Sequence, residues 1–120
     1  KNFSLSFSHN DPNPKNFIIE EDKCYLIDFS EISHREAEYD IIAFFLFAVD
    51  FLNIDDLKQL VDYYLSHFSF FYHINRSMMN QSVREFDERR KTYKNIHQLN
   101  PEQETKRKFI QSKIVNEQGE

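Results

Sequence analysis

The sequence has one glycine, one cysteine, three prolines and no tryptophan among its 120 residues. So few glycines and prolines disfavour a turn-rich β-architecture and favour helices. The lone Cys24 excludes an intramolecular disulfide and favours a reducing compartment, so we expect a cytoplasmic protein. The longest apolar run, residues 41–49, is far shorter than the roughly 20 residues of a membrane span. The net charge of −5 disfavours nucleic acid as a partner.

Aromatic residues, in contrast, are plentiful: the chain has 13 Phe and 6 Tyr. Each buried aromatic ring removes a large apolar area from water. A chain of this length fits one domain and buries roughly two thirds of its unfolded surface. The composition therefore predicts a packed core.

The first third of the chain reads as short strands around a fixed loop. Residues 3–8 alternate apolar and polar side chains, which predicts a half-buried strand. Residues 9–15 hold two prolines and two asparagines, which is typical of a loop. Residues 16–20 and 23–29 predict a β-hairpin with a two-residue turn. We expect the polar residues 30–39 to form a loop.

The rest of the chain predicts helices. Asp40 precedes an apolar segment and is expected to cap a buried helix. Asn53 or Asp55 is expected to cap the next helix, and Asn100 is expected to cap the last one. The predicted fold is α+β and mostly helical, with the hairpin packed on a bundle of about four helices. The first expected helix follows Asp40, and the other three cover roughly residues 56–73, 77–98 and 101–115. In this division residues 1–39 carry the loop and the hairpin, residues 40–116 form the helical part, and residues 117–120 are a frayed tail.

Three oxygen-bearing side chains stand at positions that a hairpin brings together. Asp11 lies in the loop, Asn16 follows it five residues later, and Asp28 ends the second strand. Carboxylate and amide oxygens suit magnesium, which binds few protein ligands together with phosphate oxygens. Phosphoryl transfer also needs a group that orients the attacking hydroxyl, and Asp11 suits that role. The alternative is a polar turn in which Asp11 and Asn16 only bond local backbone.

At these residues the sequence resembles the aminoglycoside phosphotransferase and choline kinase family, small-molecule kinases with a protein-kinase-like fold. The family's loop reads His-Gly/Asn-Asp-x4-Asn, as do residues 9–16 here, and its metal-binding segment reads Ile-Asp-Phe/Trp, as does Ile27-Asp28-Phe29. Asp40-Ile41-Ile42 stands at the family's helix start, twelve residues past Asp28. The resemblance covers residues 5–45, about a third of the chain, and implies the C-lobe of a kinase-like fold.

The resemblance implies roles for five residues. Asp11 would be the catalytic base, and Asn16 and Asp28 would bind Mg²⁺, with ATP as phosphoryl donor. His9 and Asp40 would support the loop structurally. Protein kinases usually have Arg between the His and the Asp, and Gly after Asp-Phe. This chain has Asn10 and Ser30 there, which favours a small-molecule acceptor.

Four further polar residues near the motif are candidate contacts of a substrate or phosphate. Asn13 can reach the transferred phosphate or merely form a turn. Acidic residues after the metal site can face an amine-bearing substrate such as choline, ethanolamine or an aminoglycoside, but a solvated polar loop explains them as well. The candidates are Asn13, Glu31, Glu36 and Glu38.

The family's N-lobe, with its nucleotide-covering loop, should precede His9, but only eight residues do. We therefore expect the chain to be the C-terminal part of a small-molecule kinase, inactive alone, with the N-lobe of the same protein as its partner. Two alternatives stay open. One is a non-catalytic, kinase-derived interaction module, and the other is a protein-kinase-like enzyme.

Overall fold

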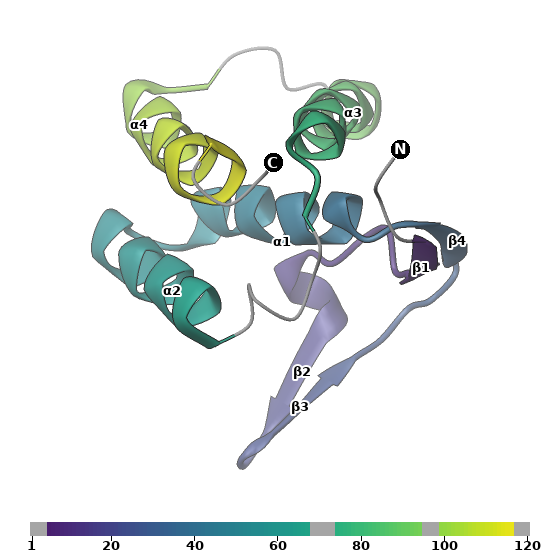
Figure 1. Cartoon of the computed structure of the whole chain (residues 1–120). Coiled ribbons are helices and arrows are strands. Elements are labelled where there is room, and N and C mark those ends of the chain that lie inside the picture. Colours follow the sequence, from purple (N-terminus) through teal and green to yellow (C-terminus); the bar gives the residue numbers. More distant parts are fainter. Residues whose placement is uncertain (1–4, 68–73, 95–98, 117–120) are drawn as a thin grey trace.

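The structure is a computed structural model that describes residues 5–67, 74–94 and 99–116. These residues form four α-helices, four β-strands and two short helical segments of other types (Figure 1). In chain order they are β1 (Leu5–Ser8), the 3-10 helix η1 (Pro14–Asn16), β2 (Phe17–Glu20), β3 (Lys23–Leu26), β4 (Ser33–Glu36), α1 (Glu38–Phe51), α2 (Ile54–His67), α3 (Arg76–Lys94), α4 (Pro101–Ile110) and the π-helical η3 (Gln111–Asn116).

The chain is α+β and mostly helical, as the sequence predicts. The described strands pair into two antiparallel two-stranded sheets, β1 with β4 and β2 with β3. In the second sheet Phe17 lies opposite Leu26 and Glu20 opposite Lys23, which is the predicted hairpin. Its turn contains Glu21 at a φ of 55°, a left-handed conformation.

Strand β4 corrects the prediction of a loop over residues 30–39. Ser33–Glu36 pairs antiparallel with β1, and Leu5 lies opposite Glu36. The pairing gives the backbone groups of β1 partners that a lone strand would lack. Only four polar residues make up β4, so the sequence has no apolar alternation to reveal it.

Helix α1 begins earlier than predicted and is not capped by Asp40. The helix starts at Glu38, and Ala37 is its N-cap without a side-chain hydrogen bond. The prediction that Asp40 caps this helix is therefore wrong, because its carboxylate is used elsewhere.

The other helix starts follow ordinary capping chemistry. Asn53 Oδ1 accepts from Asp56 N at 2.8 Å, so Asn53 rather than Asp55 caps α2. Asn100 and Gln103 form a capping box at the start of α4. The predicted helix ends at 73 and 98 and the tail 117–120 lie outside the described residues. None of the described helices is both long and apolar enough to cross a membrane.

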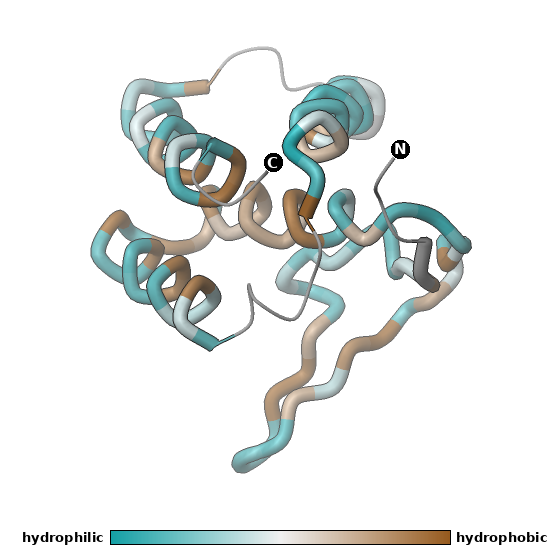
Figure 2. Tube along the Cα trace, in the orientation of Figure 1, coloured by the Kyte–Doolittle hydropathy of each residue, from teal (hydrophilic) through white to brown (hydrophobic). Residues whose placement is uncertain are grey.

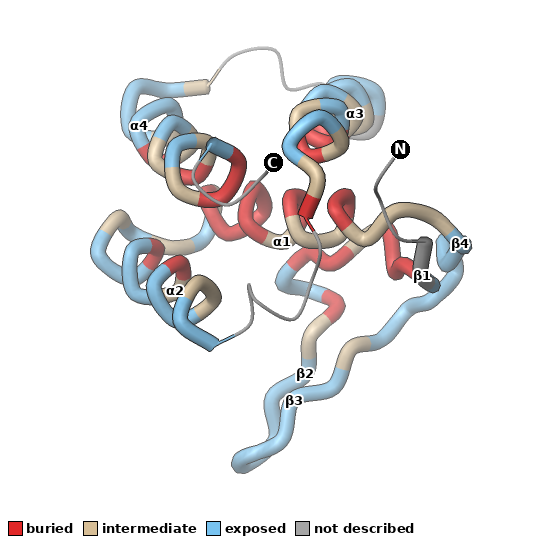
Figure 3. Tube along the Cα trace, in the orientation of Figure 1, coloured by how far each residue is buried: buried red, intermediate tan, exposed pale blue. Residues whose placement is uncertain are grey.

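Helix α1 lies at the centre of the helical part and is packed against α3 and α4 (Figure 3). Ile42 and Ala43 are fully buried, and Phe45 is only 1% exposed. Burying a side chain of the Ile or Phe class contributes about 1.5–3 kcal/mol. The partners in this core include Leu57, Val61, Met79, Val83, Phe86, Ile110 and Ile114.

The hairpin β2–β3 projects away from the helices (Figure 1), so its predicted packing on the bundle is wrong. Its strands are apolar (Figure 2), yet Ile19 is 74% exposed and Tyr25 46%. Phe17, at the base, contacts the helical part by an edge-to-face approach to Phe44, with ring centroids 5.9 Å apart. The hairpin is therefore anchored at its base, next to the predicted catalytic loop.

Candidate active site

The loop between β1 and η1 is fixed by its own polar side chains. Asn10 has a φ of 73°, a left-handed conformation that Asn tolerates better than most residues. Its Nδ2 donates to the Glu31 carbonyl oxygen and to Ser33 Oγ, each at 2.8 Å. Its Oδ1 accepts from Arg35 at 3.2 Å. The Asn10 side chain thereby ties the loop to the segment around β4.

Asp40 holds the same loop from helix α1. Its Oδ2 accepts from His9 N at 2.6 Å, and its Oδ1 accepts from Asn10 N at 2.8 Å. Bonds from backbone N–H groups to a carboxylate are stronger than neutral ones. Asp40 thus makes the contacts of a loop support, although it caps no helix.

His9 connects the loop to the end of the hairpin. Its Nδ1 accepts from Asp11 N at 3.1 Å, and its Nε2 lies 2.7 Å from the Ile27 carbonyl oxygen. A backbone N–H can only donate, so Nδ1 carries no proton and Nε2 donates to Ile27. The ring also meets Phe29 edge to face, with centroids 4.9 Å apart. These contacts are structural ones.

Asp11 and Asn16 lie together, at the spacing on which the prediction rests. Asn16 Nδ2 donates to the Asp11 carbonyl oxygen at 2.8 Å and lies 3.4 Å from Asp11 Oδ2. Asn13 Nδ2 donates to Asp11 Oδ1 at 2.7 Å, while Asn13 Oδ1 accepts from Lys15 N. Asn13 therefore forms a turn and also orients the Asp11 carboxylate.

Asp28 stands at the end of the hairpin, directly after Ile27, whose backbone is bonded on both sides. Ile27 N donates to the Asn16 carbonyl oxygen at 2.8 Å, and the Ile27 carbonyl oxygen faces His9. Asp28 has a φ of 61° and is exposed. Hydrogen bonds from the Ser30 hydroxyl and backbone N–H to its Oδ1 lower the pKa of this carboxyl. These hydrogen bonds favour the ionised form of the Asp28 carboxyl.

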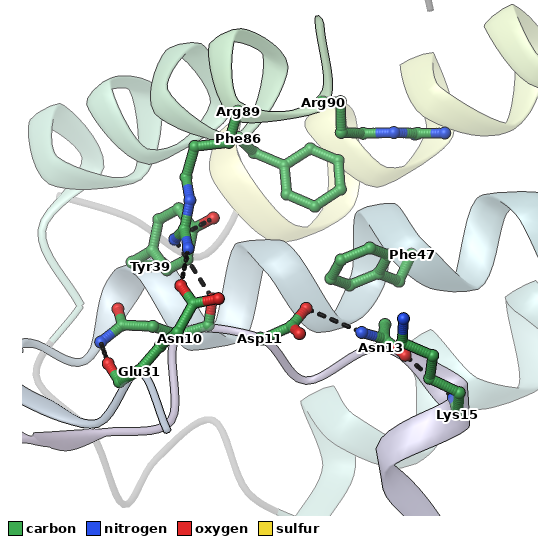
Figure 4. A pocket seen from close by; sticks show the side chains of 10 residues that line it. All are labelled: Asn10, Asp11, Asn13, Lys15, Glu31, Tyr39, Phe47, Phe86, Arg89 and Arg90. Atoms are coloured by element: carbon green, nitrogen blue, oxygen red, sulfur yellow. Dashed lines mark hydrogen bonds and ion pairs between the residues drawn. The ribbon is translucent and has the colours of Figure 1, made fainter. Parts of the chain in front are cut away.

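A cavity of about 260 Å³ opens over Asp11, between the loop and helices α1 and α3. In Figure 4 the rings of Phe47 and Phe86 lie on the side opposite Asp11 and Asn13. The aromatic side thus faces a polar side that carries the predicted base. The lining residues are Asn10, Asp11, Asn13, Lys15, Glu31, Tyr39, Phe47, Phe86, Arg89 and Arg90.

Arg89 and Tyr39 form one wall of this cavity. Arg89 Nη1 donates to the Asn10 carbonyl oxygen at 3.1 Å and to Tyr39 Oη at 2.9 Å, and its Nη2 pairs with Glu31. The guanidinium also lies over the Tyr39 ring, 5.2 Å from the centroid. Burial raises the pKa of Tyr39 to about 12, so the phenol is neutral at physiological pH.

The remaining two acidic candidates lie elsewhere. Glu36 forms an ion pair with Arg35, and the buried Glu38 accepts from Asn75 N at 2.9 Å. Neither residue lines the cavity. Arg35 also pairs with Glu85 at 2.6 Å, and this contact lowers the pKa of the Glu85 carboxyl. Glu36 therefore pairs within strand β4 and Glu38 joins α1 to the residue before α3, whereas Glu31 lies at the cavity.

Helix α3 contributes residues that the sequence does not reveal. The alternating charges of residues 84–94 indicate an exposed helix held by i,i+4 pairs, but Arg89 pairs with Glu31, and Arg90 pairs with Asp50 at 2.6 Å. One signal was present: Arg90 continues the spacing of Met79, Val83 and Phe86, the buried face of the helix. An arginine on such a face needs a partner on another element.

In the described part of the chain, no three His, Cys, Asp or Glu side chains cluster as a metal site would require. The predicted magnesium ligands are the side-chain amide of Asn16 and the carboxylate of Asp28. Comparison with protein-family models, curated protein sequences and solved structures gives no match. A function for this chain is therefore inferred from its own residues and their geometry.

Proposed function

We propose that the protein is an ATP-dependent phosphotransferase that moves the γ-phosphoryl group of ATP to a hydroxyl of a small polar molecule. The observation that carries this proposal is the joint orientation of Asp11 and Asn16. Asn13 Nδ2 donates to Asp11 Oδ1, and Asn16 Nδ2 donates to the Asp11 carbonyl oxygen and lies 3.4 Å from Oδ2. These contacts orient the Asp11 carboxylate, which lines the cavity. A positioned carboxylate is what an attacking hydroxyl requires.

Asn16 and Asp28 each offer an oxygen atom of the kind that magnesium binds. The Asn16 Nδ2 is used by Asp11, and within the described residues no donor bonds its Oδ1. The bonds of Asp28 from Ser30 engage only Oδ1, which leaves Oδ2 for another ligand. One amide oxygen and one carboxylate oxygen suit a small hard cation that also binds phosphates. Magnesium, when bound there, would neutralise charge on the phosphates of the nucleotide.

In the proposed reaction the acceptor oxygen forms a bond to the γ-phosphorus while the bond from this phosphorus to the β–γ bridging oxygen breaks. The products are the phosphorylated acceptor and ADP, and the hydroxyl proton passes to Asp11. His9 and Asp40 keep the loop in place through their bonds to Ile27 and to the loop backbone. The Phe47 and Phe86 side of the cavity covers the acceptor from the side opposite Asp11.

The test is ADP release by the full-length protein with ATP and Mg²⁺, over a panel of small hydroxyl compounds. Asp11→Asn should lower turnover at least about 100-fold, because it removes the base. The matched control is Asp22→Asn in the exposed hairpin turn, which should leave turnover unchanged. Near-normal turnover in Asp11→Asn would refute the proposal. Silence of the wild type over the panel, without nucleotide binding, would instead favour an interaction module.

A further inference from the structure

The wall of the cavity contains an arginine that is held more firmly than its acidic partner. Arg89 bonds the Asn10 carbonyl oxygen and Tyr39 Oη, in addition to Glu31. Its side chain is 25% exposed, whereas that of Glu31 is 48% exposed. If Glu31 turned away, the bonds to Asn10 and Tyr39 would still hold the guanidinium in place.

Glu31, by contrast, can leave by side-chain rotation alone. Its backbone carbonyl oxygen accepts from Asn10 Nδ2 at 2.8 Å, so its main chain is fixed. The only carboxylate contact found for it within the described residues is the one to Arg89. An ion pair with a carboxylate this exposed contributes little to stability, so another anion can displace Glu31 at little cost.

The charges of the lining support an anion at this position. Besides Asp11, which is assigned to the hydroxyl, the cavity is lined by Lys15, Arg89 and Arg90 and by one acid, Glu31. Arg90 is paired with Asp50. No acid pairs with Lys15 among the residues that the structure describes. Lys15 and Arg89 together balance Asp11 and Glu31, so the lining gains a positive charge when the Glu31 carboxylate turns away from Arg89.

We propose that the phosphoryl acceptor carries an anionic group, a carboxylate or a phosphate, that replaces Glu31 on Arg89 while its hydroxyl lies at Asp11. This inference rests on the proposed function and narrows its acceptor class. The two positions are close in space, because Arg89 bonds the carbonyl oxygen of Asn10, the residue before Asp11. The acceptor is therefore a small hydroxy acid or hydroxyalkyl phosphate.

A purely cationic acceptor fits the wall less well. An ammonium group paired with Glu31 would lie beside the fixed guanidinium of Arg89, which repels it. The Tyr39 ring, a possible cation–π partner, is already contacted by the guanidinium groups of Arg35 and Arg89, at 4.5 Å and 5.2 Å from its centroid. The expectation of an amine-bearing acceptor thus holds only if the same molecule also carries an anion.

The test compares three small probes by calorimetric binding to the full-length protein and by phosphorylation with ATP and Mg²⁺. The probes are glycerate, glycerol and ethanolamine, which share a hydroxyl and differ in charge. Wild-type protein should bind glycerate about 10-fold more tightly than glycerol, as a charged hydrogen bond allows. Glu31→Gln should tighten glycerate a further 2- to 5-fold or so, because the competing carboxylate is gone. The matched control Glu88→Gln, an exposed acid next to Arg89, should change nothing.

Each outcome either supports or overturns the proposed anion site on Arg89. Looser glycerate binding in Glu31→Gln, tighter binding of ethanolamine than of glycerate, or binding of none of the probes would overturn the inference. A variant effect on the KM for ATP alone would assign Arg89 to the phosphates of the donor and also overturn it. Tight glycerate binding that Glu31→Gln strengthens, without phosphate transfer to any probe, would sustain the anion site while the proposed function fails.

Discussion

Helix α1 and the hairpin β2–β3 are both rich in apolar side chains, yet they have opposite surroundings. Ile42 of α1 is 0% exposed, whereas Ile19 of the hairpin is 74% exposed. The helix is covered by α3 and α4, and the hairpin extends beyond them (Figures 1 and 3). An apolar residue stabilises a fold only in proportion to the area that packing removes from water. Side chains of equal hydrophobicity therefore contribute different amounts to the free energy of unfolding in these two regions.

The largest effect should come from truncating the buried isoleucine. Ile42→Ala should lower the free energy of unfolding by about 2–5 kcal/mol, because it removes buried methyl groups and leaves a cavity. Urea unfolding followed by circular dichroism measures the change. A loss below about 1 kcal/mol would mean that α1 is not the centre of the core.

The loop between these two regions is held by polar contacts, and the Asp40 carboxylate accepts two of these hydrogen bonds. Asp40→Asn should cost about 2–3 kcal/mol, because an amide NH₂ then faces one of the two N–H groups of His9 and Asn10. The matched control Asp62→Asn, exposed in α2, should change stability by less than about 0.5 kcal/mol. Turnover should fall in Asp40→Asn and not in the control. Equal stability of both variants would contradict the role of Asp40.

Tyr39, on α1 next to the loop, should respond to alkaline pH. Its pKa is raised to about 12 from an ordinary value of 10, so folding favours the neutral phenol. The stability it contributes is complete below pH 10 and is lost as the pH rises through about 12. The difference in phenolate absorbance between wild type and Tyr39→Phe should show this step near pH 12. A difference step at pH 10 would mean that the phenol is not buried.

The smallest effect should come from the hairpin. Ile19→Ala should change the free energy of unfolding by less than about 0.5 kcal/mol, because little area of this side chain is buried. It makes the same chemical change as Ile42→Ala, so the two unfolding curves form a direct comparison. A loss above about 1.5 kcal/mol would show that the hairpin surface is covered in solution.

Sequence reasoning predicted the features that depend on local spacing. The hairpin, the helical character after residue 40 and the meeting of Asp11 with Asn16 all follow from neighbours a few residues apart. It failed where the outcome depends on distant segments. Strand β4 forms because β1 needs a partner, and the exposure of the hairpin depends on where the helices lie.

The cavity wall was missed for the same reason. Arg89 bonds the Asn10 carbonyl oxygen across 79 positions of sequence. A charged helix gives no sign of which arginine reaches inward, except that Arg90 continues the buried face of α3. The predicted site therefore contained Asp11, which lines the cavity, and its neighbour Asn16, but it lacked the wall formed by Arg89 and Tyr39.

The long reach of Arg89 has a consequence for how the protein acquires its site. The loop and the hairpin need only nearby residues, but the guanidinium arrives only after α1, α2 and most of α3 have been made. Closing a contact across so much chain comes late in folding, since its entropic cost must be met by packing already in place. The complete cavity is thus a sign of completed folding: a chain whose third helix has not docked has Asp11 in its loop but lacks the wall that Arg89 supplies.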